Sequence, residues 1–167
     1  MVPVLFAVDD EPEILEDIES AFKKVKRKLS KLRPEHLGQP NIVPFDDPRK
    51  GMKKIKDFRR GNQIPIFILD IRMQGRDAGI DLLKAIRARR SLHYSPVVIL
   101  SSFGERDLID VTYRCGANSF VLKSDDPKLL AKSMERIIHY WLVNMYHSRP
   151  LGKKALNITN TQSTGGT

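Results

Sequence analysis

The sequence lacks the features that are typical of secreted, disulfide-bonded and membrane-spanning proteins. Its 167 residues include a single cysteine, Cys115, which excludes a disulfide framework and a multi-cysteine metal site. No apolar run approaches the roughly 18–20 residues that a membrane span requires. The N-terminus reaches acidic residues after eight positions and has neither a basic start nor a cleavage site, so it does not resemble a signal peptide. We therefore expect a soluble, cytoplasmic protein that does not enter a membrane.

Acidic residues are scarce in one stretch of the chain. Residues 21–60 hold 14 of the 29 Lys and Arg but only 4 of the 20 Asp and Glu. Such a basic surface can attract an acidic protein, an anionic lipid or a nucleic acid. A solvated face on two amphipathic helices is the favoured interpretation, because no aromatic side chains are interleaved with the lysines as stacking platforms for bases. Nucleic-acid binding is therefore not expected, and a constitutive binding module that uses the basic 21–60 surface is kept as the alternative function.

Two kinds of apolar segment alternate along the chain. Short runs rich in Val, Ile and Leu predict buried strands at residues 2–8, 41–45, 64–69, 97–100 and 119–122. Segments with helical spacing of apolar residues lie at 12–29, 48–58, 79–90, 107–115 and 127–145. Apolar strands that alternate with helices predict an α/β domain with a doubly wound, five-stranded parallel sheet covered on both faces. We expect one domain over residues 1–147 and a disordered tail over residues 148–167.

Reactive side chains follow four of the five predicted strands. Asp9 and Asp10 follow the first strand, Asp70 the third, Ser101 the fourth and Lys123 the fifth. The carboxyl ends of the strands meet at one edge of such a sheet, where ligands bind. We therefore expect these five side chains to converge.

Three carboxylates held together repel one another unless a cation joins them, and a compact, oxygen-only site favours Mg²⁺. Two of the acids would hold the metal, and the third is free to act as a nucleophile in aspartyl-phosphate chemistry. Lys123 and Ser101 would then contact the phosphoryl oxygens. The alternative is that Asp9 and Asp10 only cap the first helix while Lys123 pairs with Asp70.

Four strings resemble, in this order, the receiver domain of two-component response regulators: FAVDDEPEIL, FILDIRMQGRDAGIDLLKAIR, VVILSSF and GANSFVLKS. The resemblance covers about residues 2–145 and implies a flavodoxin-like sheet with strand order 2-1-3-4-5. It implies that Asp70 accepts a phosphoryl group from a phosphohistidine on a sensor histidine kinase or a phosphotransfer protein. Asp10 would ligate Mg²⁺ directly and Asp9 chiefly through water. Asp70 and the backbone carbonyl of Arg72 would complete the protein ligands.

The same resemblance implies roles for further side chains. Lys123 matches the phosphate-pairing lysine, Ser101 the switch hydroxyl and Phe120 the switch aromatic. Phosphorylation would draw Ser101 inward and let Phe120 rotate into the vacated space. Arg72 and Phe103 occupy the two positions that tune autodephosphorylation in this family. The resemblance therefore implies a signalling switch that acts on a downstream protein target, catalyses only its own phosphorylation and dephosphorylation, and is not a turnover enzyme.

The sequence departs from the family pattern near the proposed site. Lys123-Ser124 stands where the family usually has Lys-Pro, often with a cis peptide bond, and Met73-Gln74 stands where it usually has Met-Pro. The segment Asp77-Ala78-Gly79 carries one residue more than the commonest pattern. We therefore expect altered loops beside the site.

The chain is similar to one subgroup, the single-domain regulators paired with bacterial phytochrome kinases. The shared features are Lys123-Ser124, the stretch between the first two strands, and the aromatic end of the last helix. The likeness implies a homodimer through the last strand and helix, with a contact formed by Tyr140, Trp141, Val143 and Tyr146. The alternative is that these side chains only close the core at the helix end.

A rival function is a phosphohydrolase that uses Asp70 as its nucleophile. Such enzymes commonly carry a second acid two residues later as general acid, and here that place is Arg72. About twenty residues follow residue 147, too few for an independent output domain. We expect output through a protein partner, a further phosphotransfer step or dimerisation, unless a longer protein continues with an output domain beyond residue 167.

Overall fold

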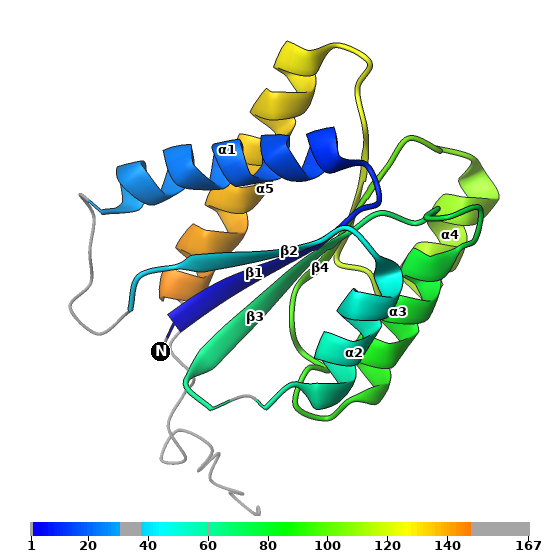
Figure 1. Cartoon of the computed structure of the whole chain (residues 1–167), viewed down its shortest axis with the longest axis horizontal. Helices are drawn as coiled ribbons and strands as arrows, with labels where there is room; N and C mark the ends of the chain where they lie inside the picture. Colours follow the sequence, from blue (N-terminus) through cyan, green and yellow to red (C-terminus); the bar gives the residue numbers. More distant parts are fainter. Residues whose placement is uncertain (1, 31–37, 60, 148–167) are drawn as a thin grey trace, which may run out of the picture.

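Five parallel strands form the centre of the protein (Figure 1). The computed structural model describes residues 2–30, 38–59 and 61–147, with side chains described up to residue 143, so the predicted tail at 148–167 lies outside the described residues. The strands are β1 (Val2–Val8), β2 (Asn41–Phe45), β3 (Gln63–Leu69), β4 (Val97–Ser101) and β5 (Ser119–Leu122). Their order in the sheet is β2-β1-β3-β4-β5, so the predicted fold class and strand order are confirmed.

Helices cover both faces of the sheet (Figure 1). They are α1 (Pro12–Leu29), α2 (Pro48–Asp57), α3 (Ala78–Ala88), α4 (Arg106–Arg114) and α5 (Pro127–His147). The helices α1 and α5 pack on one face, and α2, α3 and α4 pack on the other. All five predicted helices are present, although α3 ends two residues earlier than expected because Arg89 is extended.

The strands are apolar throughout because each contributes to two cores. In β1, Leu5 and Ala7 point into the core beneath α1 and α5, whereas Val4, Phe6 and Val8 point into the core beneath α2, α3 and α4. Successive side chains of a strand point to opposite faces, so a sheet covered on both sides needs apolar residues at every position. This explains why the strands could be recognised as uninterrupted apolar runs.

Several residues at the element ends fit their local structure. The strand β2 pairs only with β1 among the described residues, so Pro44 lies in an edge strand, where proline is tolerated. The Asp47 carboxylate caps α2 by accepting a hydrogen bond of 2.8 Å from the backbone N–H of Arg49. Gly116 follows α4 with a φ of +95°, a conformation that favours glycine at a helix end. In the part of the chain that the structure describes, no helix is long and apolar enough to cross a bilayer.

Candidate functional site

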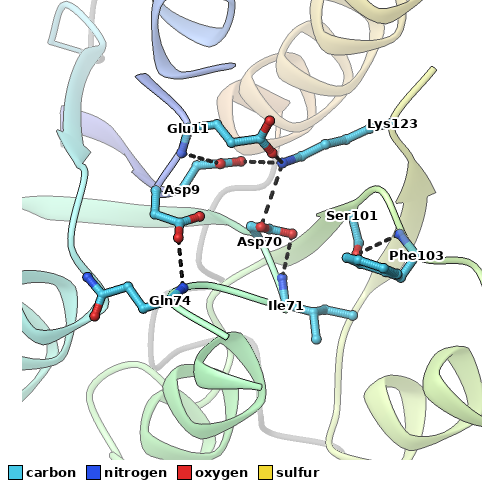
Figure 2. Close-up of polar contacts among 9 residues, drawn as sticks. Asp9, Glu11, Asp70, Ile71, Gln74, Ser101, Phe103 and Lys123 are labelled. Atoms are coloured by element: carbon cyan, nitrogen blue, oxygen red, sulfur yellow. Dashed lines mark hydrogen bonds and ion pairs between the residues drawn. The ribbon is translucent and has the colours of Figure 1, made fainter. Parts of the chain in front are cut away.

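The carboxyl ends of β1, β3, β4 and β5 bring together the five side chains singled out in the sequence, four of which are labelled in Figure 2. The three aspartates Asp9, Asp10 and Asp70 each contribute a carboxylate oxygen to a group whose members lie within 4.8 Å of one another. Asp9 and Asp70 are buried, while Asp10 is partly open to solvent. Ser101 and Lys123 are buried beside them.

Lys123 contacts three different carboxylates rather than one. Its Nζ lies 2.8 Å from Oε1 of Glu11, 2.9 Å from Oδ2 of Asp9 and 3.6 Å from Oδ2 of Asp70. Burial lowers the pKa of Lys123, but the hydrogen bond that Lys123 donates to Glu11 and the charges of Asp9 and Asp70 outweigh this effect, so the pKa is raised above its ordinary value. Lys123 therefore stays charged, and its contact with Asp70 is the longest of the three.

Glu11 is not among the site residues expected from the sequence. It directly precedes α1, where an acid is also favoured by the positive end of the helix dipole. The available signal was its position directly after the Asp9-Asp10 pair, at the end of a strand. Glu11 also donates its backbone N–H to Oδ1 of Asp9 at 3.1 Å, which helps to orient that carboxylate (Figure 2).

The buried carboxylates of this site are more basic than usual. Burial raises the pKa of Asp70 from 3.8 to about 6; the charge of Lys123 opposes this rise, and the negative charges of Asp9 and Asp10 add to it. Burial also raises the pKa of Asp9, against the attraction of Lys123. Four carboxylates thus share one ammonium group, and the site holds more negative charge than Lys123 balances.

The residues fit a hard divalent cation. Their donors are all oxygens, which suits Mg²⁺, and a divalent charge would offset the repulsion that raises the two pKa values. Oδ2 of Asp9 is buried and accepts no hydrogen bond of good geometry, although it forms the ion pair with Lys123. The site therefore has a buried oxygen whose coordination is incomplete.

The loop after β3 has an unusual turn where the family usually has Met-Pro. Met73 and Arg76 exchange two backbone hydrogen bonds of 3.0 and 3.1 Å across Gln74 and Gly75, whose φ angles are +54° and +71°. The backbone N–H of Gln74 donates to Oδ2 of Asp10 at 2.7 Å. Proline could neither adopt this φ nor donate this hydrogen bond. The expected alteration of the loop therefore takes the form of a tight turn that binds Asp10.

At Gly79, near the start of α3, the helix backbone lies so close to the backbone of Asp70 and Ile71 that no side chain fits. The backbone N–H of Gly79 donates to the carbonyl of Ile71 at 2.9 Å. A Cβ at this position would overlap the carbonyl oxygen of Asp70 and lie 2.7 Å from Cα of Ile71. These atoms belong to the backbone and cannot move aside as a flexible side chain could. The absence of a side chain at Gly79 therefore allows α3 to pack directly against the backbone of Asp70 and Ile71.

The residues proposed to switch are linked to neighbouring backbone. The Ser101 hydroxyl accepts a hydrogen bond of 3.2 Å from the N–H of Phe103 (Figure 2). Phe120 is half-buried and packs against the core beneath α2, α3 and α4. Its N–H donates to the Tyr113 hydroxyl of α4 at 3.1 Å. Ser101 therefore connects to the β4–α4 loop, and Phe120 connects to α4 itself.

Arg72 and Phe103 stack on each other beside the site. The guanidinium carbon of Arg72 lies 4.2 Å from the ring centroid of Phe103, a cation–π contact. Nε of Arg72 also pairs with Oδ1 of Asp77 at 3.5 Å. Two side chains that the sequence could only place in adjacent loops thus form one unit.

Two further expectations concern the Lys123–Ser124 bond and the end of α5. No peptide bond among the described residues is cis, so the Lys123–Ser124 bond is trans. At the end of α5, Tyr140 is exposed and packs edge-on against Trp141, with ring centroids 5.1 Å apart. The side chain of Tyr146 lies outside the described residues.

Part of the basic charge of residues 21–60 is balanced within the fold. Two lysines of α1, Lys24 and Lys28, pair with Glu135 of α5 at 2.9 and 3.7 Å. At the start of α2, two further ion pairs of 2.7 Å form between Arg49 and Asp47 and between Lys50 and Asp46. These contacts fit the interpretation of a solvated face.

Known proteins share both the sequence pattern and the fold. The family model described as "Response regulator receiver domain" matches residues 5–135. The chemotaxis protein CheY of Pseudomonas aeruginosa is 31% identical over 116 residues, which cover 70% of this chain and 89% of the relative. A receiver domain from Rhodospirillum rubrum superposes with a TM-score of 0.69 at 20% identity, covering 84% of this chain and 94% of that one. A phosphorylated cyanobacterial phytochrome response regulator, RcpA, gives a TM-score of 0.68 at 21% identity with the same coverage. At these identities the two structural comparisons show a shared fold.

Proposed function

Because the chain belongs to the response regulator receiver family, we propose that it is a Mg²⁺-dependent cytoplasmic switch phosphorylated on Asp70. The phosphoryl group would come from a phosphohistidine on a sensor histidine kinase or a phosphotransfer protein. The observation that carries the proposal is the buried Asp70 carboxylate, which lies between Lys123 and two further aspartates at the carboxyl ends of the strands. The chain would catalyse only its own phosphorylation and dephosphorylation.

The contacts suggest how the transfer proceeds. Oδ1 of Asp70 accepts the N–H of Ile71 at 2.8 Å, so Oδ2 is the freer oxygen. Oδ2 would form a bond to phosphorus as the phosphorus–nitrogen bond of the donor breaks and its electron pair returns to the imidazole. Lys123 would move from Glu11 toward the phosphoryl oxygens, because its Nζ already lies 3.6 Å from Oδ2 of Asp70.

The metal ligands follow from the same arrangement. Asp10 would bind Mg²⁺ directly and Asp9 chiefly through water, with Asp70 and the backbone carbonyl of Arg72 as the other protein ligands. When bound, the ion supplies positive charge to the phosphoryl oxygens. The turn at Gln74 would hold Asp10 in place through the hydrogen bond to its Oδ2.

The switch would begin at Ser101. If its hydroxyl turns toward a phosphoryl oxygen, the hydrogen bond from the Phe103 N–H is lost. Phe120 would then rotate inward, next to α4, whose Tyr113 hydroxyl accepts a hydrogen bond from the Phe120 N–H. A local charge change would thereby bias the arrangement of α4, β5 and α5.

A downstream protein target, or a second copy of the chain in a homodimer, would recognise that face. Leu122 on β5 and Leu129 and Tyr140 on α5 are all more than half exposed, at 55%, 54% and 58%. Exposed apolar side chains of this size commonly anchor protein interfaces.

The proposal is tested by the intact mass of the chain after incubation with Mg²⁺ and a small phosphodonor. We expect one added phosphoryl group on the wild type, none on Asp70→Asn, and none when EDTA is present. Asp77→Asn is the matched control, because it removes an exposed carboxylate from the same loop region. An adduct of equal yield on Asp70→Asn would refute the assignment of the phosphoacceptor.

A further inference from the structure

A pocket of about 420 Å³ lies at the end of the sheet opposite Asp70. It is formed by the segments that lead into β4 and β5, together with the last turns of α3 and α4. Its lining comprises Arg87, His93, Tyr94, Ser95, Arg114, Cys115, Gly116 and Asn118. The volume falls within the range of small-molecule sites, about 300–1,000 Å³. The lining contains two arginines and no acidic residue.

Arg87 is fixed in this pocket by neutral acceptors. Its Nε donates to the carbonyl of Gly116 at 2.8 Å, Nη1 donates to the carbonyls of His93 and Ser95 at 3.1 and 2.9 Å, and Nη2 donates to Oδ1 of Asn118 at 2.9 Å. A guanidinium has five N–H groups, so one N–H of Nη2 remains without a partner among the described residues. The side chain is therefore held rigidly and still has a donor available.

Gly116 makes room for this guanidinium. A Cβ on Gly116 would lie 3.0 Å from Nε of Arg87, and the φ of +95° also favours glycine here. Arg87 thus lies directly against the backbone that leads into β5. The Arg87 side chain is therefore fixed in one position within the pocket, unlike an arginine that extends freely into solvent.

The pocket has an excess of positive charge. Neither Arg87 nor Arg114 forms an ion pair with any acid in the described part of the chain, since all the acceptors of both side chains are neutral. Both residues lie in the last turn of a helix, where the helix dipole offers about half a negative charge. Two full positive charges exceed two such partial charges. An anion in the pocket would therefore meet an uncompensated field.

Arg114 and Tyr94 are exposed residues of the lining and have polar groups available to a ligand. Nε of Arg114 donates to the backbone carbonyl of Asp110 at 3.3 Å, while its terminal nitrogens form no hydrogen bond within residues 2–30, 38–59 and 61–143. Tyr94 is 92% exposed, and its ring packs edge-on against His93 with centroids 4.9 Å apart. Guanidinium forks match the oxygens of carboxylates and phosphates, and a tyrosine hydroxyl can donate to the same oxygens.

We propose that this pocket binds a small oxyanion, a compound that presents a phosphate or carboxylate group to Arg87 and Arg114. The proposal is independent of phosphorylation at Asp70, because the pocket lies before β4 and β5 whereas the acidic cluster lies after the strands.

The test is an amide NMR titration of the full chain without Mg²⁺, at constant ionic strength. Inorganic phosphate and succinate are added in separate titrations, and their relative affinities identify the preferred oxyanion. We expect saturable shifts at the amides of Ser95, Gly116 and Asn118, with little change at Asp70. Arg114→Gln should weaken binding roughly tenfold, as expected for the loss of a charge-assisted contact.

Arg106→Gln is the matched control, because Arg106 is an exposed arginine at the other end of the same helix. Its affinity should equal that of the wild type. Arg87→Lys keeps the charge but loses the fork, and should also weaken binding while circular dichroism confirms the fold. Shifts that never saturate with either ligand, or equal losses in Arg114→Gln and Arg106→Gln, would overturn the proposal.

Discussion

Replacing Asp70 by Asn should stabilise the metal-free protein near neutral pH. The pKa of Asp70 is about 6 in the folded chain and 3.8 for an unperturbed carboxyl group. The folded state therefore holds the proton more tightly than the unfolded state, and stability falls as pH rises from about 3.8 to about 6. Above that window the charged, buried carboxylate destabilises the fold, and Asn removes this cost.

The size of the effect follows from the shift. About two pKa units correspond to about 3 kcal/mol, at about 1.36 kcal/mol per unit. Asp10, one of the charges that raise this pKa, is partly open to water, and screening there reduces the free energy, so we expect about 1–2 kcal/mol at neutral pH. In a domain of this length, 1 kcal/mol corresponds to roughly 3 °C in Tm.

Urea unfolding in EDTA at about pH 4.5 and about pH 7.5 measures the effect. The stability of Asp70→Asn relative to the wild type should grow between the two pH values by about 1 kcal/mol, since part of the difference is already present at the lower pH. Asp77→Asn, which removes an exposed carboxylate, is the control. A relative stability that is constant or falls with pH would refute the reasoning. Saturating Mg²⁺ should reduce the advantage of Asn, because it binds the wild-type carboxylates.

Three further changes test the surroundings of the site. Gly79→Ala should destabilise the fold by roughly 2 kcal/mol or more in urea unfolding and should slow phosphoryl uptake, because the new Cβ collides with the backbone of Asp70. Unchanged stability and uptake would contradict the close approach of the two backbone segments. Phe103→Ala removes the ring that stacks against Arg72 and opens the site to attacking water. We therefore expect the phosphoryl half-life to shorten several-fold in a mass-spectrometric time course. A longer half-life would show that the stack does not exclude water. Glu11→Gln weakens the contact between Glu11 and Lys123, which competes with the approach of Lys123 to the phosphoryl group. Phosphoryl uptake should therefore accelerate roughly two- to fivefold. Slower uptake would mean that Glu11 holds the lysine in the position that the transfer requires.

The elements and the acidic cluster could be predicted because their signals are local. Each strand of a doubly covered sheet is an uninterrupted apolar run, and the residue that follows it lies at the carboxyl edge. Asp9, Asp70 and Lys123 could therefore be placed together without knowledge of any contact. The order of the strands required the family resemblance, since periodicity does not reveal which strands are neighbours.

The contacts within the site could not be predicted in the same way. Lys123 could reach Asp9, Glu11 or Asp70, and only the packed structure shows that Glu11 and Asp9 are closer than Asp70. The turn at Gln74 likewise depends on a positive φ in a residue other than glycine, which sequence rules disfavour. Tertiary packing decides which of several acids pairs with a lysine. It also decides where a rare backbone conformation is adopted.

The position of β1 in the sheet has a consequence for synthesis of the chain. This strand pairs with β2 on one side and β3 on the other, and it presents apolar side chains to both cores. The 61 residues from the end of β1 to the end of β3 take about 3–12 s to translate at about 5–20 residues per second. Throughout that interval the strand that leads to Asp9 lacks its β3 partner, so one of its edges is unpaired. We therefore expect the rate of translation and the access of chaperones to β1 to influence the yield of folded protein.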